Sequence, residues 1–169
     1  MPNWCEGTIK FRGKREDIIR AMTEGLQPID GAIEDSKIVF DEEYSEPDYL
    51  CFTAVQDELF WISDTYRHFV DFSSKHYTAL RFGSDFIIAI PFRAAWAINV
   101  KSDADRNGLD LFANKYNVDV RATGFESGMG FMQTVEVNRY GDVLVDYEES
   151  YDHDYEKFLW ECDMPLLGG

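Results

Sequence analysis

Residues 1–13 read MPNWCEGTIKFRG, and this stretch decides the expected fold. Polar and apolar residues alternate over residues 8–12, and this period of two predicts a half-buried strand that ends at Gly13. A helical pattern follows at once in residues 14–26, where apolar positions recur at helical spacing and Gly25 suits the C-terminal cap. The chain is therefore expected to begin with a strand and a helix, in a place where many proteins carry a polar tail.

The same criteria assign the rest of the chain. Further strands are expected over residues 36–43, 49–56, 85–90, 92–100 and 118–125. Further helices are expected over residues 57–77 and 102–117, the second capped by Ser102 or Asp103, and a short terminal helix within residues 151–167. Glycines at 124, 128 and 130 predict a turn or bulge, and residues 131–150 predict a hairpin that closes near Asn138 to Gly141.

Length and composition predict one domain over residues 1–169. A chain of 169 residues can bury a substantial core, and 45% hydrophobic with 15% aromatic residues is far from the composition of disordered proteins. The cysteines Cys5, Cys51 and Cys162 form no CxxC pair, which indicates thiols of a reducing compartment. With no signal peptide and no apolar run near the roughly 18 to 20 residues that span a bilayer, we expect a cytoplasmic protein without membrane contact.

The charge is strongly one-sided. Sixteen Lys and Arg stand against 32 Asp and Glu, which gives a formal net charge of −16. Such a field repels nucleic-acid phosphates and anionic membranes, so no direct DNA binding is expected and a basic partner is favoured. The basic residues concentrate near the N-terminus, at Lys10, Arg12, Lys14, Arg15 and Arg20.

Acidic residues gather in two segments that are candidates for partner binding. Residues 41–48 hold five acids and are expected to form a solvated loop or the margin of an edge strand, while residues 142–163 hold nine acids and one lysine. Carboxylates at alternate strand positions lie about 6.6 to 6.8 Å apart, a phosphate-like spacing. They could mimic nucleic acid or simply keep an aromatic-rich domain soluble. The candidate partner-binding residues are Asp41, Glu42, Glu43, Glu46, Asp48, Asp142, Asp146, Glu148, Glu149, Asp152 and Asp154.

No catalytic residue, cofactor site or metal site is predicted. The sequence lacks the nucleophile elbow and the phosphate-binding glycine loops, and its histidines have no metal-ligand spacing. The acids around His153 could hold a divalent cation, but a solvated acidic segment has the same composition. An enzyme that uses Cys51 or a histidine would need that residue in a polar cleft with a partner in hydrogen-bond reach.

Several short motifs in the sequence resemble those of a known family. The N-terminal MPNWC, Trp96 within AAWAINV, the turn ESGMGF and the later GDVLVDYEE are similar to the YubB-type ferredoxin-like family of phages and conjugative plasmids, over roughly residues 1–25 and 92–150. The sequence departs from that family at residues 97–99, where Ala, Ile and Asn stand in place of frequent prolines. No catalytic residue follows from the resemblance.

What the resemblance implies is an α+β, ferredoxin-like fold. It has an antiparallel sheet with helices on one face, a central first strand, an insertion at about residues 42–91 and a C-terminal β-meander. Trp4 and Cys5 would then pack at the end of the sheet as a plug of the core.

Resemblance and acidity together predict a non-enzymatic mobile-element protein. It would inhibit a basic host protein, such as a nucleic-acid-binding nuclease or effector, in the manner of an anti-CRISPR or anti-restriction protein. An alternative is an RNA-associated module that stacks bases on exposed aromatic residues, with Phe11 as the residue to examine. A solvated acidic domain without such a partner is the third possibility.

Overall fold

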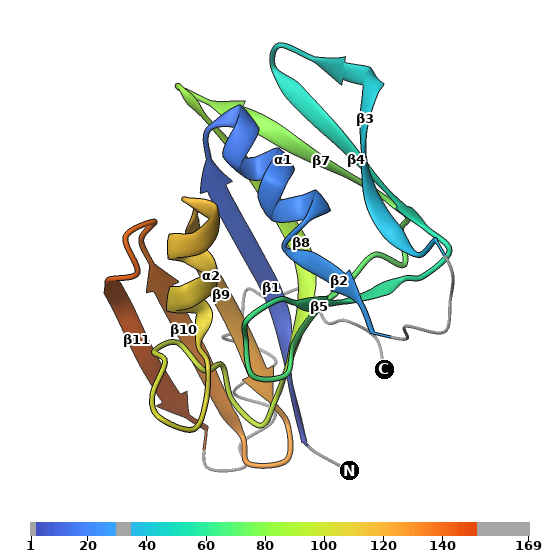
Figure 1. Cartoon of the computed structure of the whole chain (residues 1–169). Coiled ribbons are helices and arrows are strands. Elements are labelled where there is room, and N and C mark those ends of the chain that lie inside the picture. Colours follow the sequence, from blue (N-terminus) through green and yellow to red (C-terminus); the bar gives the residue numbers. More distant parts are fainter. Residues whose placement is uncertain (1–2, 30–34, 152–169) are drawn as a thin grey trace.

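The computed structural model describes residues 3–29 and 35–151, and these residues form eleven strands and two helices (Figure 1). The elements are β1 (Trp4–Gly13), α1 (Arg15–Thr23), β2 (Leu26–Pro28), β3 (Lys37–Glu46), β4 (Tyr49–Val55), β5 (Leu59–Ile62), β6 (His68–Asp71), β7 (His76–Phe82), β8 (Asp85–Ala95), α2 (Leu109–Tyr116), β9 (Asp119–Glu126), β10 (Phe131–Val137) and β11 (Val143–Ser150). The strand pairings among these elements are antiparallel, so the chain has an α+β architecture that is rich in sheet.

Strand β1 lies in the interior of the sheet. The main path runs β11-β10-β9-β1-β8-β6-β5-β2, and β7 also pairs with β8 and leads to β4 and then β3. β1 pairs with β8 from Trp4 opposite Ala95 to Gly13 opposite Phe86, and with β9 over most of its length on the other side. The central position expected for the first strand is confirmed.

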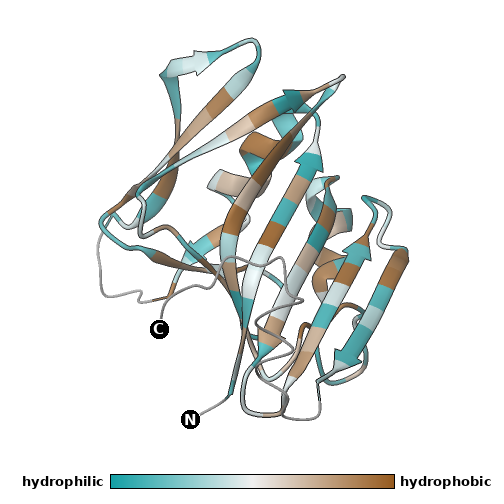
Figure 2. Cartoon of the chain, turned by 180° about the vertical axis from the view of Figure 1, so that it is seen from behind, coloured by the Kyte–Doolittle hydropathy of each residue, from teal (hydrophilic) through white to brown (hydrophobic). Residues whose placement is uncertain are grey.

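Both helices cover one face of the sheet, and no helix of residues 3–29 and 35–151 covers the other face, which we call the open face (Figures 1 and 2). The odd-numbered residues of β1 are buried beneath the helices, and the ring of Phe11 lies 5.4 Å from that of Phe112 in α2. α1 contributes Ile18 and Met22, which are fully buried. Burial of this aromatic and aliphatic layer is the main source of stability that the geometry offers.

The predicted helix over residues 57–77 is wrong. The segment forms β5 and β6, in which burial alternates with the period of a strand, and the turn between them contains Asp64 and Arg67 at φ +57° and +55°. The aromatic and β-branched residues of this segment pack well on a pleated surface. β5 pairs with β2, and β6 with β8, so distant partners determine the structure here.

Two other boundaries differ from expectation. The strand predicted over residues 92–100 ends at Ala95, and the helix predicted over residues 102–117 begins only at Leu109. Gly108 is the N-cap residue, whereas Ser102 donates from its hydroxyl to the Asp110 carboxylate at 2.6 Å. Residues 96–108 therefore form an irregular connection.

The predicted C-terminal hairpin is confirmed. β10 and β11 pair in register from Phe131 opposite Ser150, and the turn closes where the Asn138 amide donates to the Asp142 carbonyl. Gly141 adopts φ +84°, a left-handed conformation that glycine reaches without a Cβ clash. The expected terminal helix lies outside the described residues.

A network of charges joins this turn to the end of β1. Arg139 donates to the carboxylates of Asp119 at 2.9 Å and Asp85 at 3.0 Å, and these also bind Arg12 and Lys14 respectively. Burial alone would raise the pKa of Asp119, but hydrogen bonds from Arg139 and Arg12 outweigh it and lower the pKa to about 2. Ion pairs of Arg12, Lys14 and Arg139 thus connect the β10–β11 turn and the end of β1 to the starts of β8 and β9.

Replacing Gly7 tests how closely the central strands approach. A Cβ on Gly7 would lie 1.9 Å from the backbone oxygen of Thr123 in β9, so the backbones of β1 and β9 would have to separate. We expect Gly7→Ala to lower the free energy of unfolding by about 3 kcal/mol or more, as overpacking against backbone does. Urea denaturation measures the change, with Thr8→Ala on the open face as a control that costs less than about 1 kcal/mol. Equal stability of Gly7→Ala and wild type would contradict the register.

Candidate functional site

The β3–β4 hairpin projects beyond α1 at one side of the molecule (Figure 1). Its pairing is regular from Lys37 opposite Val55 to Asp41 opposite Cys51 and resumes at Glu46 opposite Tyr49. The residues between form a bulge, in which the Ser45 hydroxyl donates to the Asp41 carbonyl and accepts from the Cys51 amide. The acidic segment 41–48 is therefore the irregular margin of an edge strand, one of its two expected forms.

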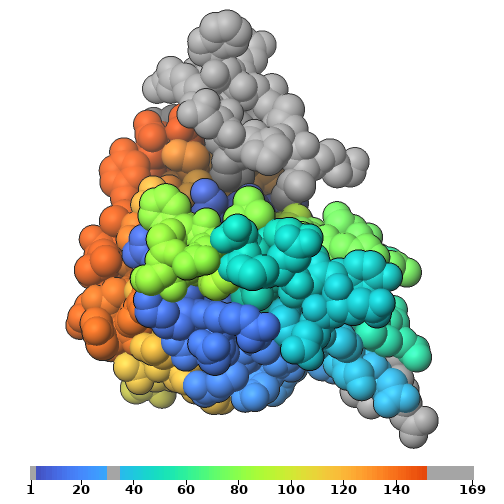
Figure 3. All heavy atoms as spheres, turned by 90° about the horizontal axis from the view of Figure 1, so that it is seen from above, coloured from blue at the N-terminus to red at the C-terminus, as the bar shows by residue number. Residues whose placement is uncertain are grey.

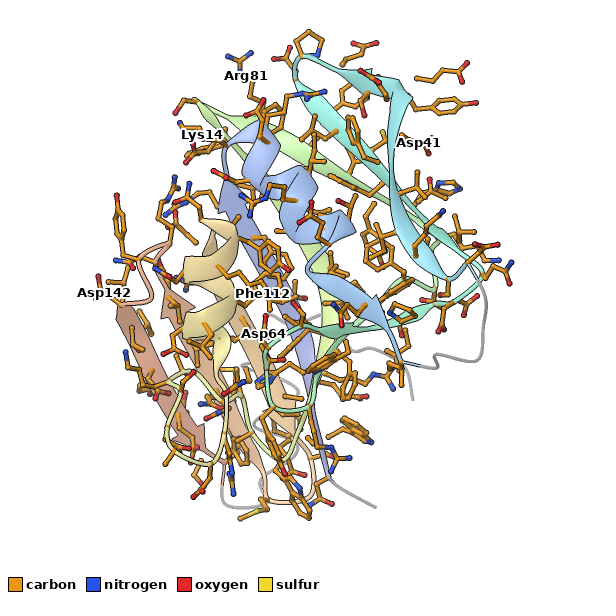
Figure 4. All side chains as sticks on the ribbon, in the orientation of Figure 1. Lys14, Asp41, Asp64, Arg81, Phe112 and Asp142 are labelled. Atoms are coloured by element: carbon orange, nitrogen blue, oxygen red, sulfur yellow. The ribbon has the colours of Figure 1, made fainter. Side chains whose placement is uncertain are left out.

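Two of the five acids in this hairpin, Asp41 and Asp48, bind neighbouring side chains, and a third, Glu46, is hydrogen-bonded to the Tyr49 side chain. The Asp41 carboxylate accepts from the Thr53 hydroxyl at 2.5 Å, and Asp48 forms an ion pair with Arg81 at 3.3 Å (Figure 4). Glu42, Glu43 and Glu46 are exposed. From residue 38 to residue 66 the chain has eight Asp and Glu and no Lys or Arg. After Lys37 at its start, the hairpin therefore carries charge of one sign.

An exposed aromatic ring stands among these acids. Tyr44 is 67% exposed, although tyrosine usually packs a large part of its ring. A second tyrosine of the hairpin, Tyr49, also lies beside an acid: burial and then the nearby Glu46 carboxylate raise the pKa of its hydroxyl. We call residues 42–46 the acidic tip.

The described part of the second acidic segment, residues 142–151, includes β11, and three of its four acids are hydrogen-bonded within the chain. Asp142 accepts from the Asn138 side chain, Asp146 from Gln133 at 3.2 Å, and Glu149 from the Tyr151 hydroxyl at 3.2 Å. Glu148 is exposed. Asp152 and Asp154, the remaining candidates, lie outside the described residues.

The described part of the second acidic segment, residues 142–151, lies apart from residues 41–48. β11 ends the sheet on one side, whereas β3 is reached through β7 and β4 on the other side of β8. Asp41 and Asp142 lie at opposite sides of the molecule in Figure 4, and the orange β10–β11 and cyan β3–β4 segments are likewise separated in Figure 3. They are two surfaces, not one continuous acidic face.

The open face of the sheet carries the basic residues of β1. Lys10 and Arg12 line a shallow depression of about 170 Å³ together with Arg121 of β9. Arg12 is paired with Asp119, and Arg121 with Glu136 at 2.7 Å, so much of the positive charge is neutralised. Phe11 is fully buried on the opposite face and cannot stack a base, which removes the residue on which the RNA interpretation most depended.

Cys51 has no histidine in contact among the described residues. Its thiol donates to the Tyr44 carbonyl at 3.1 Å, and the nearest histidine on that strand face, His76, instead contacts the Thr53 hydroxyl at 3.1 Å. The described surroundings of Cys51 thus lack the base that would activate a thiol.

Trp4 and Cys5, expected to precede the first strand, are its first two residues and pack into the molecule. Cys5 is fully buried, and burial followed by the nearby Glu126 carboxylate raises the pKa of its thiol to about 12. Trp4 is half-buried, with its ring edge-on to Phe69 at 5.8 Å. The Asn3 carbonyl accepts from the Trp96 amide, so this end of β1 is tied to the chain that follows β8.

A feature that the sequence analysis missed is the Trp96 loop, residues 96–99. Its backbone is held by two buried side chains from distant strands. The Gln133 side chain accepts from the Ile98 amide at 2.8 Å and donates to the Ile98 carbonyl at 3.1 Å, and His68 Nε2 accepts from the Asn99 amide at 2.9 Å. The loop is fixed from the interior of the protein.

Trp96 itself points the other way. It has φ +75°, a left-handed conformation that is costly for a residue with a Cβ, and its side chain is 52% exposed. Strained residues that present a large exposed ring are concentrated at functional sites. One signal was available in the sequence: Gln133 stands in the inward register of β10 with Val135 and Val137, where a polar side chain needs a buried partner.

His68 must stay neutral to hold this loop. The side chain is fully buried, and burial lowers its pKa to about 4. A hydrogen bond with the Tyr66 backbone acts in the opposite direction and is the smaller effect. Nε2 is the acceptor for Asn99, so the proton of the neutral ring sits on Nδ1. Protonation of Nε2 would remove the acceptor.

Three further findings concern the whole described chain. In residues 3–29 and 35–151 no cluster of His, Cys, Asp and Glu has the arrangement of a metal site. In the same residues no helix is long and apolar enough to cross a membrane. Comparison of the chain with protein-family models, curated proteins and solved structures found no match.

The depressed pKa of His68 predicts a specific pH dependence. Between pH 6.5 and about 4 the unfolded chain binds a proton here that the folded chain does not, so stability falls as the pH falls through this window. The difference amounts to about 3 kcal/mol. We expect His68→Gln, which retains an acceptor but does not titrate, to show a smaller loss of unfolding free energy between pH 6.5 and 4.5. Parallel pH profiles of variant and wild type would refute a neutral, buried His68.

Proposed function

We propose that this chain is a non-enzymatic inhibitor that binds a basic, nucleic-acid-handling partner through the acidic tip of the β3–β4 hairpin. The observation that carries the proposal is the combination of three exposed carboxylates, Glu42, Glu43 and Glu46, around the exposed ring of Tyr44. No Lys or Arg of residues 38–66 offsets these charges.

The negative charge of the chain favours a partner with a positively charged groove. The net charge of −16 steers a basic protein towards the chain from a distance, and the projecting hairpin concentrates the negative field at one point. A groove that binds phosphates would accept the carboxylates of the acidic tip in their place. Tyr44 adds an aromatic contact of the kind that supplies much of the energy at protein interfaces.

The β11 acids serve a different purpose in this proposal. Three of them already accept hydrogen bonds within the chain, and they lie along a strand at the end of the sheet. Charged side chains on such a strand discourage pairing with other chains. We therefore assign β11 to solubility and edge protection, and partner binding to the hairpin.

The arrangement of strands and helices also favours a mobile-element protein. We propose that β1, α1, β7, β8, α2 and β9 form a ferredoxin-like core, with β10 and β11 as the meander. The insertion is then β2 to β6, residues 26–71, and not the expected residues 42–91, because β7 and β8 belong to the proposed core. The strand order β9-β1-β8-β7 and the helices on one face favour it. Together with the resemblance to phage and plasmid proteins, this suggests a mobile-element protein that acts in the host cytoplasm against a defence nuclease or effector, as anti-CRISPR and anti-restriction proteins do.

Affinity capture from host lysate tests the proposal. The tagged chain is expected to retain a basic nucleic-acid-binding protein at about 0.05 M salt and to release it at about 0.5 M salt, because screening weakens exposed charge pairs. Added nucleic acid should compete with the chain for that partner. Capture that is insensitive to salt and to nucleic acid would contradict a nucleic-acid mimic.

Two charge-matched variants locate the surface. We expect Glu42→Lys, Glu43→Lys and Glu46→Lys combined to weaken binding of the captured partner at least about tenfold, through unfavourable charge pairs. Asp146→Lys, Glu148→Lys and Glu149→Lys combined change the net charge equally and should bind within about threefold of wild type. Binding constants from surface plasmon resonance decide between them, and the reverse order would assign the interface to β11.

A further inference from the structure

A pocket of about 310 Å³ lies beside the Trp96 loop, outside both acidic segments. Trp96, Ile98 and Asn99 form one wall, and Tyr66 and Arg106 form the other. This volume is at the lower end of the range for small-molecule sites, so it suits a ligand with one ring system.

The pocket combines aromatic surface with a positive charge. The Arg106 guanidinium lies 5.3 Å from the centre of the Tyr66 ring, and among the described residues it has no ion pair within 4.0 Å. The segment that carries it is anchored, because the Arg106 amide donates to the Asp103 carboxylate and the Tyr66 amide donates to the Asn107 carbonyl. Arg106 is close enough to Asp103 to help lower the pKa of that carboxyl, after the Asp105 and Arg106 amides that donate to it. Because no carboxylate of the described residues forms an ion pair with the guanidinium, it can still bind an anionic ligand.

The Trp96 wall is ordered before any ligand binds. Gln133 and His68 hold the backbone of the loop, and the Asn99 side chain donates to the Asn107 carbonyl at 3.0 Å, which joins the two walls. A ligand would therefore not have to order this part of the pocket, and such preorganisation favours binding. The strained φ of Trp96 is maintained by the same contacts.

We propose that this pocket binds a single nucleotide, with its base stacked on the indole of Trp96 and its phosphate on the guanidinium of Arg106. Every base offers a π-face to an aromatic platform, and a guanidinium pairs with phosphate in a bidentate geometry. Arg106 repels a cationic ligand, and the size of the pocket together with the charge of −16 disfavours a longer nucleic acid. This inference goes beyond the proposed function and stands independently of it, because it involves neither acidic segment.

Isothermal titration calorimetry with AMP, GMP, CMP and UMP tests the site on the full chain. At least one of these nucleotides should bind saturably with a dissociation constant below about 1 mM. Trp96→Gly removes the ring but suits the left-handed backbone, so the loop should keep its conformation. We expect Trp96→Gly and Arg106→Gln each to weaken binding at least about tenfold.

Matched controls separate the site from general effects. Phe82→Ala removes another exposed ring (67% exposed) and Lys37→Gln another exposed cation, and both should bind as wild type does. Adenosine and inorganic phosphate should each bind more weakly than AMP. The proposal is overturned if no nucleotide binds, if phosphate alone binds as well as AMP, or if the two pocket variants bind as the controls do.

Discussion

The pairing of β1 with β8 on one side and β9 on the other is the constraint on which the rest of the structure depends. At its N-terminal end, β1 brings the Asn3 carbonyl to Trp96 and buries Cys5. At its C-terminal end, Arg12 joins the network around Arg139 and Asp119. The close approach at Gly7 lets the backbones meet between these ends. One strand therefore positions both the Trp96 loop and the turn that carries β11.

Local sequence patterns predicted the elements whose partners are near in sequence or whose alternation is strong. β1, α1 and the β10–β11 hairpin belong to this class, since period-two and helical spacing are unambiguous there. The segment from 57 to 77 misled the same reasoning because its apolar residues satisfy helical spacing as well as strand alternation. Pairing of β5 with β2 and of β6 with β8 resolves that ambiguity, and those contacts cannot be read from a local window.

The Trp96 loop could not be predicted for a related reason. Its backbone partners, His68 and Gln133, lie 31 and 35 residues away from the positions that they bind. Only the polar side chain of Gln133 in an inward register hinted at a buried role. Of the acidic candidates, the sequence identified the residues but not their partners. Asp41 accepts from Thr53 within the hairpin, and Asp48 pairs with Arg81 of β7, whereas Glu42, Glu43 and Glu46 are exposed.

Paired cations and unpaired carboxylates lie in different parts of the molecule. Several cations form ion pairs with carboxylates, in the network at the end of β1 and on the open face, where Arg121 pairs with Glu136. The acidic tip retains unneutralised charge on a projecting hairpin, far from the acids of β11 (Figures 3 and 4). We therefore propose that a partner binds the acidic tip, and that β11 is a solvated edge of the sheet.

Hydrogen exchange of the chain, alone and in complex with its captured partner, tests that assignment most directly. If the partner binds the acidic tip, we expect added protection of backbone amides in the β3–β4 hairpin, with the exchange of β11 unchanged. Protection confined to β11 or to the Trp96 loop, with the hairpin amides exchanging as in the free chain, would contradict it.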